Sequence, residues 1–149
     1  AQGFQTITLE FSAPTEGMSD FDVEVVPPDV TAPNIVQIES IGNFVYLSLD
    51  RPLAPGRWTK LTNLHDGTST CLGYLPGDVN NDGTTSPVDI LRLIDHLNGV
   101  VNYDIYHADM DRSDVADAAD ILRLIDLLNG AGEFEAWNGR SLPANPCLP

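Results

Sequence analysis

The first 75 residues alternate between apolar and polar side chains over short runs. Apolar residues stand at alternate positions in four runs, which lie at residues 4–11, 21–25, 36–38 and 45–49. Residues 58–62 and 68–72 are further strand candidates with a weaker pattern. Turn-forming pairs such as Pro27-Pro28 and Gly42-Asn43 separate them. Strict alternation is typical of half-buried strands. We therefore expect a small antiparallel β-sandwich over residues 1–75.

Beyond residue 75 the hydrophobic period changes to that of a helix, so we expect an all-α unit to follow the sandwich. Apolar side chains recur at i, i+3, i+4 and i+7, and they are Ile90, Leu93, Ile94 and Leu97, then Ile121, Leu124, Ile125 and Leu128. We expect these two faces to pack on each other, because neither short helix is stable alone. In the connector, Tyr103, Ile105 and Tyr106 are expected to cover this core.

A twelve-residue stretch before the first helix carries oxygen-bearing side chains at the spacing of a calcium loop. Its expected ligands are Asp78, Asn80, Asp82, the carbonyl of Thr84, Ser86 and Asp89. Gly83 stands at position 6, where the sharp turn needs a left-handed backbone. Ser86 and Pro87 then favour the start of a helix.

The loop returns after 31 residues, with Asp78 corresponding to Asp109. Its expected ligands are Asp109, Asp111, Ser113, the carbonyl of Val115, Asp117 and Asp120. Asp114 replaces the glycine, and aspartate tolerates the left-handed region better than most residues. The sequence therefore predicts two Ca²⁺ ions. Without them, we expect the repeat region to be unfolded or molten.

A second stripe on each predicted helix faces away from the expected core. It comprises Val88, Leu91, Arg92 and Asp95 in the first helix, and Ala119, Leu122, Arg123 and Asp126 in the second. An exposed stripe that is apolar and charged indicates a partner surface. The alternative is that the Arg–Asp pairs are ordinary surface pairs and that Leu91 and Leu122 pack on the connector.

The duplicated loop–helix pattern, with aspartate at each position 12, resembles a dockerin, the module that docks enzymes onto cohesin domains. The resemblance covers about residues 76–132, whereas residues 1–75 resemble an immunoglobulin-like companion module only loosely. It implies cohesin contacts at Pro87, Val88, Leu91, Arg92, Asp95 and His96, and at Ala118, Ala119, Leu122, Arg123, Asp126 and Leu127. Because the two halves are so alike, binding in either of two orientations is possible.

The composition is strongly acidic, with 22 Asp and Glu against 7 Lys and Arg and a net charge of −15. Such a balance argues against nucleic acid, whose binders carry basic patches, and against anionic membrane surfaces. No run of eighteen apolar residues predicts a membrane-spanning segment. No nucleophile–base pattern indicates an enzyme, since the dense carboxylates are explained by the ions.

Two cysteines, Cys71 and Cys147, bracket the repeat region. We expect a disulfide between them, although two free thiols are the alternative. The tail, residues 133–149, is expected to fold back on the repeat region through Phe134 and Trp137. Because the chain starts at Ala1, it is expected to be a processed secreted chain or an excised fragment.

These features predict a secreted, calcium-stabilised module that anchors a larger protein, such as a polysaccharide-degrading enzyme, to a cohesin-type scaffold or a cell surface. The alternative is a structural subunit of an extracellular assembly, in which the calcium unit acts as a clamp.

Overall fold

The computed structural model describes residues 4–15, 18–132 and 135–148. The chain forms two compact units, of which one comprises Ala1–Tyr74 with Pro143–Pro149 and the other Leu75–Leu142. The domain limits expected at residues 75 and 132 remain a prediction. In the structure the tail is divided, because its part up to Leu142 belongs to the second unit and the rest to the first.

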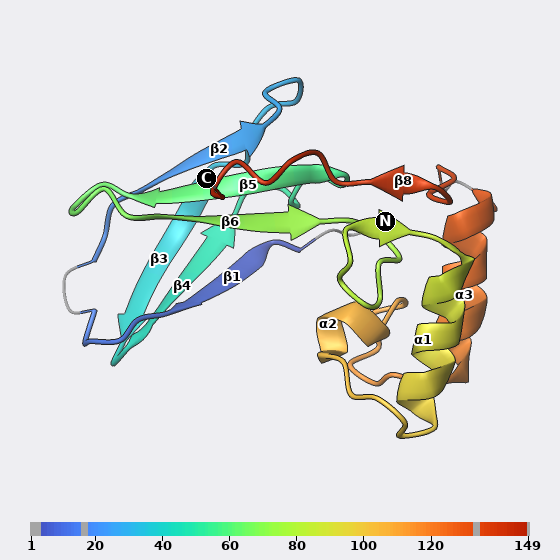
Figure 1. The fold of residues 1–149 in the computed structure, drawn as a ribbon. Helices are drawn as coiled ribbons and strands as arrows, with labels where there is room; N and C mark the ends of the chain where they lie inside the picture. Colours follow the sequence, from blue (N-terminus) through green and yellow to red (C-terminus); the bar gives the residue numbers. More distant parts are fainter. Residues whose placement is uncertain (1–3, 16–17, 133–134, 149) are drawn as a thin grey trace. The chain divides into compact units, whose positions relative to one another are not determined.

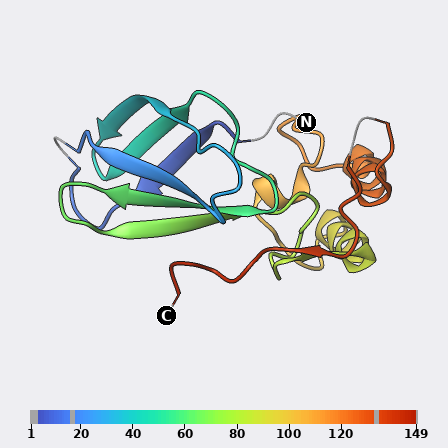
Figure 2. The ribbon, with the colours of Figure 1, turned by 90° about the horizontal axis from the view of Figure 1, so that it is seen from above.

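The first unit is a sandwich of two three-stranded antiparallel sheets (Figures 1 and 2). One sheet has the order β1 (Thr6–Glu10), β4 (Phe44–Leu49), β3 (Ile35–Ile41). The other has the order β2 (Phe21–Val26), β5 (Arg57–Asn63), β6 (Ser69–Tyr74). All six predicted strands are therefore present. The sheet orders correspond to B-E-D and C-F-G of an immunoglobulin sandwich.

The core of the first unit comes from positions that alternate inward on facing strands, together with Leu53 from the segment between β4 and β5. Its buried side chains are Ile7, Val45, Leu47, Leu49, Leu53 and Leu61. Val36 departs from the expected alternation, because a bulge between Ile35 and Gln37 shifts the register and leaves 64% of Val36 exposed.

The second unit contains the helices α1 (Pro87–Leu97), α2 (Ile105–Ala108) and α3 (Ala118–Asn129). Helices α1 and α3 lie side by side in both views (Figures 1 and 2). The sequence predicted an all-α unit, but the two-residue strands β7 (Thr84–Thr85) and β8 (Arg140–Ser141) pair in antiparallel fashion within it.

The core between α1 and α3 follows the predicted helical faces in most positions. Its buried members are Val79, Leu93, Ala108, Leu124 and Leu128, and Ile90, Leu97, Tyr103 and Ile121 pack against them. The connector expectation was wrong for Ile105 and Tyr106, which are 44% and 61% exposed. The small side chain of Ala108 fills that place in the core instead.

A second, smaller core explains why α3 is turned relative to its predicted face. Leu127 is buried against Leu75 and Trp137, whereas Ile125 is 36% exposed. Trp137 also donates its backbone N–H to the Leu127 carbonyl at 3.0 Å. The tail thus packs on the end of α3 through Trp137, while Phe134 lies outside the described residues.

A disulfide joins Cys71 of β6 to Cys147 of the tail, as expected, with 5.9 Å between the two Cα atoms. The Trp58 indole N–H also donates to the Pro143 carbonyl at 2.8 Å. The end of the tail is therefore fixed to the first unit by a covalent bond and a hydrogen bond. Within the described residues, no helix has the length and apolar character that a membrane crossing requires.

Candidate metal centre

The two predicted loops share an unusual backbone. Positions 4 and 6 have positive φ in both, at 57° and 82° for Asn81 and Gly83, and at 62° and 67° for Arg112 and Asp114. Asp114 therefore adopts the left-handed conformation that glycine provides in the first loop. At position 4, Asn81 is of a residue type that is enriched in this conformation, whereas Arg112 gives no signal for it in the sequence.

The first aspartate of each loop organises the turn through the same hydrogen bonds. The Asp78 carboxylate accepts the N–H groups of loop positions 5 and 6 at 3.1 and 2.8 Å. The Asp109 carboxylate accepts the corresponding N–H groups at 3.0 and 2.8 Å. Both loops therefore curl around a carboxylate that also belongs to the proposed ligand set.

The last aspartate of each loop is fully buried, with 1% of Asp89 and 0% of Asp120 exposed. One of its oxygens accepts an N–H from the start of the loop, which is Val79 at 2.9 Å or Asp111 at 3.0 Å. The other oxygen accepts the N–H of the helix N-cap residue at 2.8 Å in both loops. This side chain thereby joins the beginning of the loop to the helix that follows.

Position 9 of each loop is the N-cap of the following helix. Ser86 accepts the Val88 N–H at 3.2 Å, and Asp117 accepts the Ala119 N–H at 2.7 Å. Both helices begin with a complete capping box. The cap at Ser86 was predicted, whereas Asp117 was interpreted only as a carboxylate ligand, although an aspartate three residues before another acid is a recognisable cap signal.

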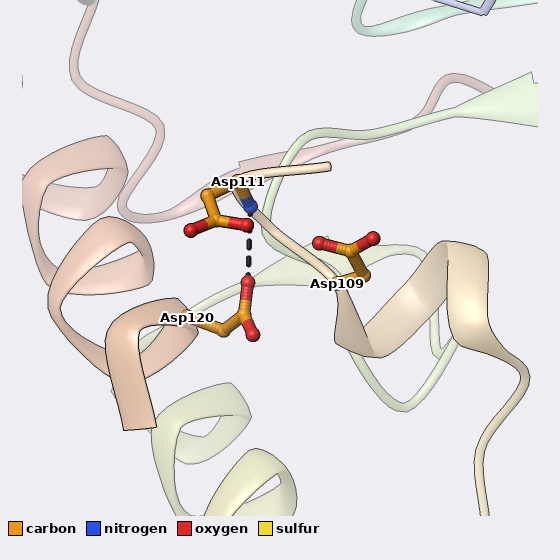
Figure 3. A group of neighbouring side chains, drawn as sticks. All are labelled: Asp109, Asp111 and Asp120. Carbon is orange, nitrogen blue, oxygen red and sulfur yellow. Dashed lines mark hydrogen bonds between the residues drawn. The ribbon is translucent and has the colours of Figure 1, made fainter. Parts of the chain in front are cut away.

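The second loop brings three carboxylates together at the scale of a cation. One oxygen each from Asp109, Asp111 and Asp120 lie within 4.8 Å of one another. Figure 3 shows Asp109 at the end of α2, Asp111 within the loop and Asp120 in the first turn of α3. Two ligands on opposite sides of a calcium ion are about 5 Å apart, given Ca–O distances of about 2.3–2.6 Å. The residues of this loop therefore fit the ion.

The first loop holds its ligand side chains in a network of their own. Asn80 donates its amide to Asp82 at 2.9 Å, and Thr84 donates its N–H to the other Asp82 oxygen at 2.9 Å. Burial raises the pKa of Asp78, although the N–H groups that it accepts lower it, and the charges of Asp89 and Asp82 add to the rise. A divalent cation would offset this mutual repulsion.

The second stripe on each helix is exposed at its apolar positions. Val88, Leu91 and Leu122 are 48%, 61% and 67% exposed. Arg92 and Asp95 form an ion pair at 3.6 Å along the stripe. Of the remaining expected contact residues, the exposed ones are Pro87, Ala118, Ala119 and Asp126, and the half-buried ones are His96 and Arg123.

Leu127 does not lie on this surface, since only 8% of it is exposed. Its counterpart in the first repeat, His96, accepts the Tyr103 N–H at 3.1 Å through Nδ1. The two repeats therefore differ at the C-terminal ends of their stripes. The sequence carries a signal of this difference, since the polar His96 stands where the second repeat has the apolar Leu127. What the sequence does not show is the cover, which Leu75 and Trp137 provide for Leu127.

Residues 76–129 match the family model of the dockerin type I domain. This segment is a dockerin domain. Dockerin domains bind calcium and associate with cohesin domains, so the loops and the exposed stripes now have a common context. No curated protein matches the chain.

Proposed function

We propose that this chain is a secreted interaction module whose dockerin domain, stabilised by two Ca²⁺ ions, anchors a larger protein to a cohesin-type scaffold. The observation that carries the proposal is the duplication itself. Two loops with the same hydrogen bonds around Asp78 and Asp109 each lead into a helix with an exposed apolar stripe.

The first ion would be held by Asp78, Asn80, Asp82, the Thr84 carbonyl, Ser86 and Asp89. The second would be held by Asp109, Asp111, Ser113, the Val115 carbonyl, Asp117 and Asp120. The oxygen-only composition of both sets suits calcium rather than a transition metal, which prefers nitrogen or sulfur ligands. Each ion supplies positive charge, and the chain supplies the geometry that closes the loop on its helix.

The ions act on the partner surface through the helices. Asp89 and Asp120 lie in the first turns of α1 and α3, so order in each loop fixes the start of the helix that carries the stripe. The stripe residues themselves bind no ion. Calcium is therefore expected to control partner binding by positioning α1 and α3 rather than by direct contact.

The partner surface is the combined outer stripe of α1 and α3, with Leu91 and Leu122 at its centre. Burying an exposed leucine side chain in a partner contributes roughly 1.5–3 kcal/mol. The charged residues on the stripe, including Arg92 and Asp95, would give the contact its register and specificity.

The disulfide supports a role outside the cytosol, because such bonds persist in oxidising compartments. The larger protein would be a polysaccharide-degrading enzyme or another extracellular cargo. Within this chain, the proposal assigns the dense carboxylates to calcium and none of them to catalysis.

The test is binding to a panel of immobilised cohesin domains, with calcium and with chelator. The double variant Leu91→Asp and Leu122→Asp should lose at least tenfold in affinity, which corresponds to about 1.4 kcal/mol. Its calcium titration should remain that of the wild type. Val100→Asp is the matched control, because Val100 is 70% exposed and lies outside both stripes.

Two results would contradict the proposal. Undiminished cohesin binding by the double variant would exclude the stripes as the contact surface. Absence of calcium uptake by the intact chain would remove the basis of the whole assignment.

A further inference from the structure

The two calcium loops differ in what lies against positions 7 and 8. In the first loop these positions are Thr84 and Thr85, which form β7 and pair with Ser141 and Arg140 of β8. In the second loop they are Val115 and Ala116, and no strand of the described chain pairs with them. The two loops are therefore repeated in sequence, but only the first is seen to pair with a strand of the tail.

The residues that flank β8 bind the carbonyl groups on either side of Thr84. The Leu142 N–H donates to the Gly83 carbonyl at 3.0 Å, and the Gly139 N–H donates to the Thr85 carbonyl at 2.8 Å. Neighbouring carbonyls of an extended chain point to opposite sides, so the Thr84 carbonyl points away from β8. That carbonyl is the proposed position-7 ligand, and β8 leaves it available.

The corresponding carbonyl of the second loop is engaged within the loop. The Ser113 hydroxyl donates to the Val115 carbonyl at 3.1 Å, and Val115 is 57% exposed. An ion in this loop would have to displace that contact or share the oxygen. The second loop has converging carboxylates, but no strand in the described ranges pairs with its position 7.

Strand β8 is itself anchored before it reaches the loop. Trp137 is 7% exposed and packs on Leu127, and its backbone N–H donates a hydrogen bond to the Leu127 carbonyl near the end of α3. Leu142 packs against the same cluster on the other side of β8. The strand is therefore a fixed support rather than a loose end that happens to pass the loop.

We infer that β8 is a positioning element for the first calcium site alone, so that removing its hydrogen bond to Gly83 weakens calcium binding in the first loop and not in the second. The inference rests on the proposed function, because it requires both loops to bind the ion. It also gives the C-terminal tail a role in the order in which the two sites fill.

The test compares Leu142→Pro with Leu142→Ala. In each variant, the NMR signals of backbone amides in the two loops are followed during a calcium titration, which gives a calcium midpoint for each loop. Both variants lose the leucine side chain, but only proline removes the N–H. Residue 142 already precedes Pro143, so its backbone is restricted to extended conformations that proline also adopts. The Gly83 and Asp114 amides report the two loops, because each donates to the first aspartate of its own loop at 2.8 Å.

The calcium midpoint at Gly83 should rise roughly three- to tenfold in Leu142→Pro relative to Leu142→Ala, as expected for the loss of one backbone hydrogen bond. The midpoint at Asp114 should be the same in both variants. Equal Gly83 midpoints, or equal shifts in the two loops, would overturn the inference. If neither amide responds to calcium in the wild-type chain, the proposed function fails instead.

Hydrogen exchange in the wild-type chain decides the matter if Leu142→Pro does not fold. Protection of the Gly139 and Leu142 amides should develop with the calcium step of Gly83. Protection that follows the Asp114 step, that needs no calcium, or that merges with a single step for both loops would count against an independent effect on the first loop.

Discussion

The two units of this protein differ in the burial and the hydrogen-bond partners of their carboxylates. In the β-sandwich, Asp50 is exposed and accepts hydrogen bonds from Arg51 and Asn34, which hold its pKa well below the ordinary range. In the dockerin unit, Asp89 and Asp120 are buried and accept backbone N–H groups. Among the described residues, the sandwich keeps its acids out of its interior, whereas the dockerin unit buries Asp89 and Asp120 where each loop meets its helix.

The difference indicates where each unit obtains its stability. The sandwich closes a continuous apolar core between two sheets, with Leu47 and Leu61 nearly inaccessible. The dockerin unit has one layer of contact between α1 and α3, and its loops hold several negative charges close together. A cation is expected to be part of the second fold and irrelevant to the first.

Calcium removal should have the largest effect on stability, and it should destabilise the dockerin unit without destabilising the sandwich. Ligand present at a thousand times its dissociation constant stabilises a fold by about 4 kcal/mol, and that contribution disappears with chelation. The helical circular dichroism should fall, while exchange protection in β4 and β5 persists. A helical signal that is unchanged by chelator would contradict the comparison.

Truncation of the sandwich core should give the reverse result. Leu47→Ala removes a side chain that is 0% exposed, at a cost of roughly 3 kcal/mol. The loss, measured by hydrogen exchange of sandwich amides, should be the same with and without calcium. Val36→Ala is the control, since Val36 is 64% exposed and should change little. A calcium-dependent loss in Leu47→Ala would mean that the units share their stability.

Placing glycine at position 6 of the second loop, or aspartate at position 6 of the first, should change the stability of the unit by a smaller amount. The two changes should have opposite signs. Asp114→Gly relieves a left-handed residue and should stabilise the calcium-loaded unit by roughly 1 kcal/mol. Gly83→Asp should destabilise it by a similar amount through the backbone alone, because a Cβ there meets nothing within 4 Å. Thermal unfolding in saturating calcium measures both changes.

Asp114→Asn is the control for charge, since it removes the carboxylate and keeps a side chain at that backbone position. If Asn stabilises the unit as much as Gly, repulsion between loop acids is the cause, and the conformational explanation is wrong.

The smallest effect is expected at Asp50, on the surface of the sandwich. Its folded pKa is lower than its unfolded pKa, so it contributes stability above the ordinary aspartate range that is lost as the pH falls. Asp50→Asn should therefore flatten the acid dependence of sandwich unfolding below about pH 4. Arg51→Ala should do the same, since the Arg51 hydrogen bond is the largest cause of the shift. Parallel pH curves for wild type and variants would rule out this contribution.

Much of the architecture could be predicted from local patterns, because strands and helices impose fixed periods on the side chains that they bury. The six strands, the core positions Leu93 and Leu124, and the outward stripe of Leu91 and Leu122 follow from those periods. The position-6 backbone and the cysteine pairing were also predictable, from residue chemistry and from the even cysteine count.

The sequence by itself determined that this protein repeats a loop rich in side-chain oxygens, each copy followed by an amphipathic helix, because residue spacing and helical period are local properties. Only the tertiary structure decided that Leu127 is buried, that Ile125 is exposed, and that β8 pairs with the first loop. Those outcomes depend on where the tail returns in space, and contacts such as Leu127 with Trp137 or Thr85 with Arg140 leave no periodic trace in the chain.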